Sequence, residues 1–146
     1  MTAQELADQK KELADHELLD QFERATLPLE SFHHAEHVRV AFLYLRGRPV
    51  LEALQAFSTA LQRFAAANGK SNLYHETITW AYIFLIRERL ARARKIQSWE
   101  EFAKDNTDLL HWKGGALTRF YREETLRSDL AKQIFVLPDK CVETAL

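Results

Sequence analysis

Helix-forming residues run through this chain with few interruptions, because its 146 residues include only four glycines and three prolines. Apolar residues recur at spacings of three and four, which is the period of an amphipathic helix. No segment shows the strict alternation of apolar and polar residues that is typical of a strand. The sequence therefore predicts an all-α fold, a compact helical bundle of about five to seven helices that forms a single domain over residues 1–146.

Capping residues predict where the first helix begins. Thr2 and Glu5 have the spacing of a capping box, in which each side chain bonds the backbone N–H of the other residue. The first helix should therefore begin at Ala3. It should either continue to about Arg24 or break near Asp15, whose carboxylate could cap a second helix.

Turn signals divide the rest of the chain. If everything before residue 26 is counted as the first helix, the later long helices should span 32–47, 49–68 and 72–94. Shorter helices should follow Ser98 and occupy 116–126 and 129–135, with a turn at Gly114–Gly115. The helix at 72–94 is apolar on nearly all sides over 78–86, so we expect the other helices to surround it.

Charge and cysteine content exclude several classes of function. The 20 Lys and Arg residues nearly balance the 21 Asp and Glu residues, so we expect no nucleic-acid or membrane partner. The longest uncharged runs, 53–62 and 77–86, are about half of what spans a bilayer. Cys141 is the single cysteine, which excludes an intramolecular disulfide. The N-terminus lacks the apolar stretch of a secretory signal, and we expect a cytoplasmic protein.

Three of the six histidines, namely His33, His34 and His37, lie within five positions at the start of the second helix. Residues three or four apart share a helix face, so His34 lies on the same face as the apolar residues Val38 and Ala41. His34 and His37 should therefore face the core. His33 is rotated by about 100° from His34 and should lie at the edge of that face.

A second polar cluster, His75 and Glu76, lies near the start of the fourth helix, which we expect the other helices to surround. Polar groups at such a position are unfavourable unless they bond to something. If the two helix starts are in contact, His34, His37 and His75 come together. Because about 100° separates His75 from Glu76 on a helix, the carboxylate would not bind the same ion. It would orient a ligand imidazole or act as a general base on bound water.

Three imidazoles are a donor set that suits a divalent metal ion, Zn, Fe, Mn or Ni, with an open position for water or substrate. The sequence thus predicts a metal-dependent enzyme that acts on a small molecule between the second and fourth helices. His34, His37 and His75 would bind the metal, and Glu76 would be the catalytic residue. Residue types do not separate hydrolysis, hydration and oxygen chemistry.

Two alternatives remain open at this point. The histidines could line a metal-free polar pocket, or they could be structural groups that only order the core. In the structural case the protein would be a non-catalytic module that binds a small molecule or a partner protein. Of the remaining histidines, His16 lies in a heavily charged helix and should be solvated. His111, with Trp112 and Lys113, could line the mouth of a pocket, but we expect it to pack within a loop.

The segments "FHHAEHVRVAFLYL", "YHETITWAYIFLI" and "FVLPDK" resemble a group of short uncharacterised bacterial helical proteins. The pattern reads F-x-H-x-x-H-V, then Y-H-E-T-x-T, then a terminal L-P-D, and covers 17–140. The residues that match it are Phe32, His34, His37, Val38, Tyr74, His75, Glu76, Thr77 and Thr79. The resemblance implies a shared fold and allows a shared site. It implies no particular activity.

Overall fold

A computed structural model describes residues 1–112 and 115–140, and every regular element within these residues is helical. The α-helices are α1 (Ala3–Glu23), α2 (His34–Leu45), α3 (Val50–Ala67), α4 (Glu76–Ala93), α5 (Trp99–Asp105), α6 (Glu123–Leu126) and α7 (Asp129–Gln133). Short 3-10 turns connect them: η1 (Leu29–Ser31), η2 (Ser71–Leu73), η3 (Thr107–Leu110) and η4 (Ala116–Arg119). The prediction of an all-α bundle of five to seven helices is confirmed. Gly114 of the predicted turn and Cys141 lie outside the described residues.

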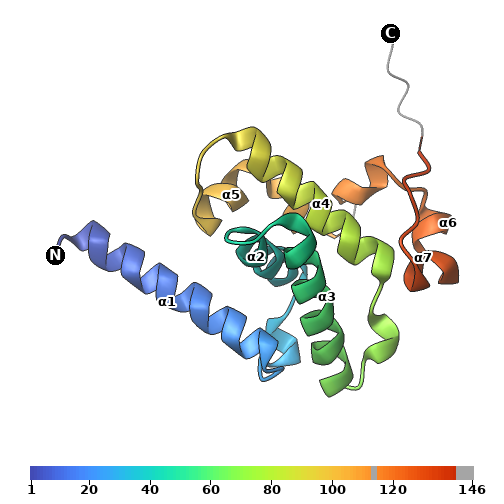
Figure 1. Ribbon diagram of the computed structural model, residues 1–146, viewed down its shortest axis with the longest axis horizontal. Coiled ribbons are helices and arrows are strands. Elements are labelled where there is room, and N and C mark those ends of the chain that lie inside the picture. The colour runs from blue at the N-terminus through green and yellow to red at the C-terminus, as the bar shows by residue number, and fades with distance from the viewer. Residues whose placement is uncertain (113–114, 141–146) are drawn as a thin grey trace, which may run out of the picture.

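The helix α1 is a single unbroken helix. Its capping box is formed as predicted: the Glu5 N–H donates to Thr2 Oγ1 over 3.1 Å, and the Thr2 N–H donates to the Glu5 carboxylate over 2.8 Å. The alternative break near Asp15 is wrong, because Asp15 lies inside the helix and is buried. Its carboxylate accepts a hydrogen bond of 2.6 Å from Arg39 on α2. The N-terminal half of α1 extends away from the other helices (Figure 1).

The centre of the molecule is formed by α2, α3 and α4. Figure 1 shows α4 crossing α2 and α3, with α5 at one side and α6 and α7 at the other. Most of α2 is buried, as is one face of α3. Phe22 at the end of α1 packs against Phe57 and Phe64 of α3, with ring centroids 5.9 and 5.7 Å apart. These aromatic contacts join α1 to the central helices.

Two helices begin later than the sequence predicted. The chain around Ser71–Leu73 forms the turn η2, and α4 begins at Glu76 with His75 as its extended N-cap. The His75 ring replaces the usual Ser or Asp cap, because its Nδ1 accepts the Ile78 N–H over 3.1 Å. Likewise α2 begins at His34, and His33 is its N-cap. Histidine is not a common cap, which is why the sequence signal was missed.

The predicted helix over 116–126 is wrong in one respect, because η4 and α6 are separate elements. The Asp139 carboxylate accepts the Arg122 N–H over 3.0 Å and also bonds the Thr125 hydroxyl. These bonds satisfy backbone and side-chain groups at the start of α6. The aspartate of the L-P-D motif therefore holds the C-terminal segment against α6.

The C-terminal segment is also fixed to α4. The buried Thr77 hydroxyl donates to the Ile134 carbonyl over 2.7 Å and accepts the Val136 N–H over 3.0 Å. The helix α7 consequently ends at Gln133, two residues earlier than predicted, and the chain continues in an extended conformation. No helix in the described part of the chain is long and apolar enough to cross a membrane.

Candidate functional site

The three histidines that the sequence selected line one cavity of about 620 Å³, which we call the main cavity. His34 and His37 come from the start of α2, and His75 caps α4. The other walls are mostly apolar. They include Leu29, Phe32, Leu61, Phe64, Ala65, Leu73, Ile78, Trp112 and Leu126. Volumes of this size are typical of sites for small organic ligands.

A smaller space of about 50 Å³, which we call the inner cavity, lies beside the main cavity. Both cavities are lined by His34, His37, Leu61, Ile78 and Thr79. The inner cavity adds Tyr82 of α4, whose buried hydroxyl has no hydrogen-bond partner among the described residues. Burial raises the pKa of Tyr82 to about 12, so the hydroxyl keeps its proton at neutral pH.

His34 is held by a loop that is distant in sequence. Its Nε2 lies 2.9 Å from the Leu109 carbonyl of η3, and because a carbonyl only accepts, Nε2 carries the proton. The ring also makes edge contacts with Tyr82 and Trp112. Burial lowers the pKa of His34, an effect that the Leu109 hydrogen bond partly offsets. A neutral His34 therefore has an unprotonated Nδ1.

Both ring nitrogens of His75 are already in use. Nδ1 accepts the Ile78 N–H, and Nε2 donates to the Leu126 carbonyl over 2.7 Å. Only the neutral ring with the proton on Nε2 satisfies both bonds. Burial lowers the pKa of His75, which favours that neutral form. His75 therefore joins the start of α4 to the end of α6.

His37 differs from the other two histidines. Its ring stacks on Phe32 with centroids 3.9 Å apart, and no hydrogen bond joins it to another described residue. Burial and, to a smaller extent, the neighbouring His34 lower the pKa of His37 to about 4. The ring is thus neutral at pH 7, with one donor and one acceptor for a ligand.

Glu76, the predicted catalytic residue, does not line the main cavity. Its Oε1 accepts hydrogen bonds from the Tyr74 hydroxyl over 2.7 Å and from the Trp80 Nε1 over 2.8 Å. The Tyr74 oxygen in turn lies 2.6 Å from Ser58 Oγ on α3. Glu76 is therefore part of a network that connects η2, α3 and α4.

As arranged here, the three histidines are not placed around one metal ion. Among residues 1–112 and 115–140, no group of three or more His, Cys, Asp or Glu side chains is placed to hold one ion. The lone pair of His75 Nδ1 is already used by Ile78, and His75 Nε2 carries a proton. Metal binding at His75 would cost both of these hydrogen bonds. We therefore derive no reaction step through a metal ion.

Sequence reasoning assigned only the histidines of these cavities to the site, and Tyr82, Lys70 and Trp112 are among the residues that it did not assign. Tyr82 lies on the same helix face as His75 and Thr79, so the helical period of α4 could have predicted that Tyr82 belongs to the site. Lys70 and Trp112 belong to connecting segments and line the main cavity only through the tertiary fold. Helical periodicity carries no information about such positions.

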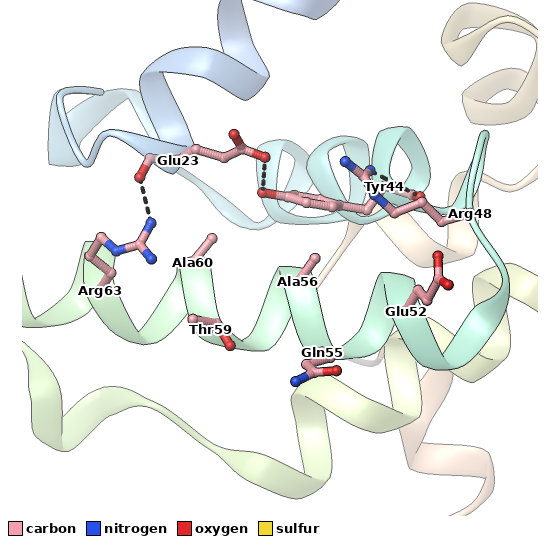
Figure 2. A pocket seen from close by; sticks show the side chains of 9 residues that line it. All are labelled: Glu23, Tyr44, Arg48, Glu52, Gln55, Ala56, Thr59, Ala60 and Arg63. Atoms are coloured by element: carbon pink, nitrogen blue, oxygen red, sulfur yellow. Dashed lines mark hydrogen bonds between the residues drawn. The ribbon is translucent and has the colours of Figure 1, made fainter.

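A further hollow of about 480 Å³ lies where the end of α1 meets α2 and α3 (Figure 2). Four of its polar residues, Glu23, Tyr44, Arg48 and Arg63, already contact one another. The Tyr44 hydroxyl donates to the Glu23 carboxylate over 2.8 Å, and Arg63 donates to the Glu23 carbonyl over 2.9 Å. Arg48 lies over the Tyr44 ring at 4.8 Å. These contacts serve to join three helices, and the main cavity is the better candidate for a binding site.

Comparisons with protein families, with curated proteins and with solved structures find no match to this chain. The function of the protein must therefore be inferred from the geometry of the cavity.

Proposed function

We propose that this protein binds a small, largely apolar organic molecule in the main cavity. The observation that supports this proposal is the composition of the cavity wall: nine apolar residues surround three histidines, and His37 has no hydrogen-bond partner for its ring among the described residues. Apolar walls with a few polar groups are typical of ligand pockets. The walls supply affinity, and the polar groups orient the ligand.

In the main cavity the polar contact proposed for the ligand is the neutral His37 ring, and a polar group that reaches from there into the inner cavity would also meet the Tyr82 hydroxyl. Each can donate or accept a hydrogen bond, so together they suit an uncharged hydroxyl or carbonyl group. A buried hydroxyl that has no partner is costly, and a bound ligand would remove that cost at Tyr82. His34 and His75 would act as fixed parts of the wall, because backbone carbonyls hold their rings.

Calorimetric titration with 1-octanol tests this proposal. We expect saturable binding by the wild-type protein and loss of binding in Ala65→Phe, which fills part of the main cavity. Ala66→Phe is the matched control, because Ala66 is the next residue of α3 but is exposed and does not line the cavity. Absence of saturable octanol binding, or equal binding by Ala65→Phe, would overturn the proposal.

The metal-dependent enzyme predicted from the sequence is a second proposal. It is supported by His34 and His37, which lie one turn apart on α2 and line both cavities, and by the unprotonated Nδ1 of His34. Two imidazoles on one helix face are a common start for a divalent metal site. Metal analysis of untagged protein decides this proposal: a stoichiometric Zn, Fe, Mn or Ni ion supports it, and its absence after purification without chelators contradicts it.

We also propose a cytoplasmic location and no nucleic-acid partner. The nearly balanced charge, with a net value of −1, supports the absence of electrostatic attraction to phosphates. The single cysteine is compatible with a reducing compartment. Tight, salt-sensitive binding to duplex DNA would contradict this part of the proposal.

A further inference from the structure

Lys70 is the one side chain with a full charge at neutral pH among the described residues that line the main cavity. Among the described residues no aspartate or glutamate lines this cavity, and the three histidines favour their neutral forms. Within residues 1–112 and 115–140, the fixed charge that a ligand meets there is therefore positive. A cationic ligand would find no carboxylate to pair with in this part of the chain.

From this arrangement we infer that the ligand is an amphipathic monocarboxylate, with its apolar body inside the main cavity and its carboxylate paired with Lys70 at the mouth. This inference rests on the proposed function of the cavity. It adds the charge of the ligand and the direction in which the ligand lies.

The interior of the cavity does not suit an anion. Phe32 and Phe64 line it, and the His37 ring beside them is neutral. A carboxylate buried without a charged partner is strongly unfavourable, so the charge of a bound anion must stay near solvent. The apolar part of the same ligand gains by entering.

Exposed apolar side chains and the ammonium group of Lys70 line the mouth of the cavity. Leu73 and Trp112 line the cavity yet remain 64% and 54% exposed, which extends its apolar wall to the surface. Lys70 is also exposed, and its carbonyl accepts the Leu73 N–H over 2.8 Å. It follows the left-handed Gly69, two residues beyond the end of α3 at Ala67. The Lys70 N–H donates to the Ala65 carbonyl over 2.7 Å, and Ala65 itself lines the cavity. The backbone of Lys70 is therefore fixed at the cavity edge.

Three ligands with the same chain test the inference: octanoate, 1-octanol and octylammonium, which are negative, neutral and positive. Dissociation constants should be measured by calorimetry at low salt for wild type, Lys70→Ala and Lys70→Glu. Lys104→Glu is the matched control, because Lys104 is equally exposed and lies on α5, outside the lining of the main cavity. The affinities of the variants are compared for each ligand separately. Differences in hydrophobicity between the three head groups therefore do not affect the comparison.

We expect Lys70→Ala to weaken octanoate binding by about threefold to fivefold, the range of an exposed ion pair. Lys70→Glu should weaken it by about tenfold or more, because attraction becomes repulsion, and should strengthen octylammonium binding. Octanol binding should not change with either variant. Added salt should reduce the effect of Lys70 on octanoate.

The inference and the proposed function fail in different ways. If octanol binds to the wild type but octanoate affinity is the same in Lys70→Glu, the inference is overturned and the proposed function stands. An equal loss of octanoate affinity in Lys104→Glu would show a general charge effect and would also overturn the inference. If neither octanol nor octanoate binds, the proposed function is overturned together with it.

Discussion

His34, His37 and His75 line one cavity, but each is held there in a different way. Carbonyl groups of η3 and α6, which are distant in sequence, fix the rings of His34 and His75, whereas His37 only stacks on Phe32. A hydrogen bond from a ring nitrogen sets the tautomer and the orientation of an imidazole. The three histidines should therefore respond differently to substitution and to pH.

Replacement of His34 should damage the protein more than replacement of His33. His34→Ala removes the hydrogen bond to the Leu109 carbonyl and the edge contacts with Tyr82 and Trp112. We expect a loss of about 1–3 kcal/mol in the free energy of unfolding. The side chain of His33 is 74% exposed, so His33→Ala should change this free energy by less than about 0.5 kcal/mol.

Urea denaturation of both variants, with metal content measured on the same samples, checks this prediction. The account of the inward helix face is contradicted if His33→Ala is the damaging change and His34→Ala has no effect.

Lowering the pH should destabilise the fold because His37 is neutral in it. The pKa of His37 falls from an ordinary value of 6.5 to about 4 in the folded protein. Between these values the unfolded chain binds more protons than the folded one, so the free energy of unfolding falls as pH decreases. One such group contributes at most about 1.4 kcal/mol per pH unit. The lowered pKa values of His34 and His75 act in the same direction.

Melting temperatures from pH 7 to pH 4.5 check the effect of pH. His37→Leu should show a smaller decrease than wild type, and the exposed His16→Ala should follow the wild type. A wild-type protein that becomes more stable as pH falls through this window would contradict the assignment.

At the scale of helices and loops, ordinary capping signals were reliable and unusual ones were not. Thr2 and Ser98 cap α1 and α5 as the sequence predicted. His75 was expected inside a helix, because a histidine cap bonds its helix through a ring nitrogen and has no common sequence signature. The split at 119–123 also escaped prediction, because it depends on Asp139, which is distant in sequence.

Thr77 should be essential for docking the C-terminal segment on α4. Thr77→Val keeps the shape of the buried side chain but leaves the Ile134 carbonyl and the Val136 N–H without their partner. We expect a loss of about 1–3 kcal/mol in the free energy of unfolding. Thr59→Val, an exposed substitution within α3, is the matched control. Equal stability of the two variants in guanidinium denaturation would show that this contact does not hold the segment.

Asp15 should fix the second half of α1 to α2. Its buried carboxylate lies 2.6 Å from Arg39 and 3.7 Å from Arg46. Asp15→Ala leaves the half-buried Arg39 without its charge partner, and we expect a loss of about 3 kcal/mol. Asp8→Ala, in the exposed half of the same helix, should cost far less. Hydrogen exchange of α1 amides would test this, and equal protection in the two variants would contradict it.

At the scale of the whole molecule, the main cavity draws on α2, α3, α4, α6 and three connecting segments. Helical period predicted that His34 and His37 face inward, and the apolar surroundings of α4 predicted that His75 meets them. Periodicity did not predict that the carbonyl groups of Leu109 and Leu126 hold two of these rings. Those features depend on contacts between segments more than 50 residues apart in sequence. The role of Glu76 as a catalytic residue and the resemblance to short bacterial proteins stay predictions.

The central claim is that a small apolar molecule binds among His34, His37 and His75. The most direct test follows the imidazole resonances of all six histidines by NMR during a titration with 1-octanol. The resonances of His34, His37 and His75 should shift along one saturable curve, while those of the exposed His16 and His33 stay fixed. Ala65→Phe should abolish these shifts. Octanol binding that leaves the three cavity histidines unshifted, or that shifts all six equally, would contradict the claim.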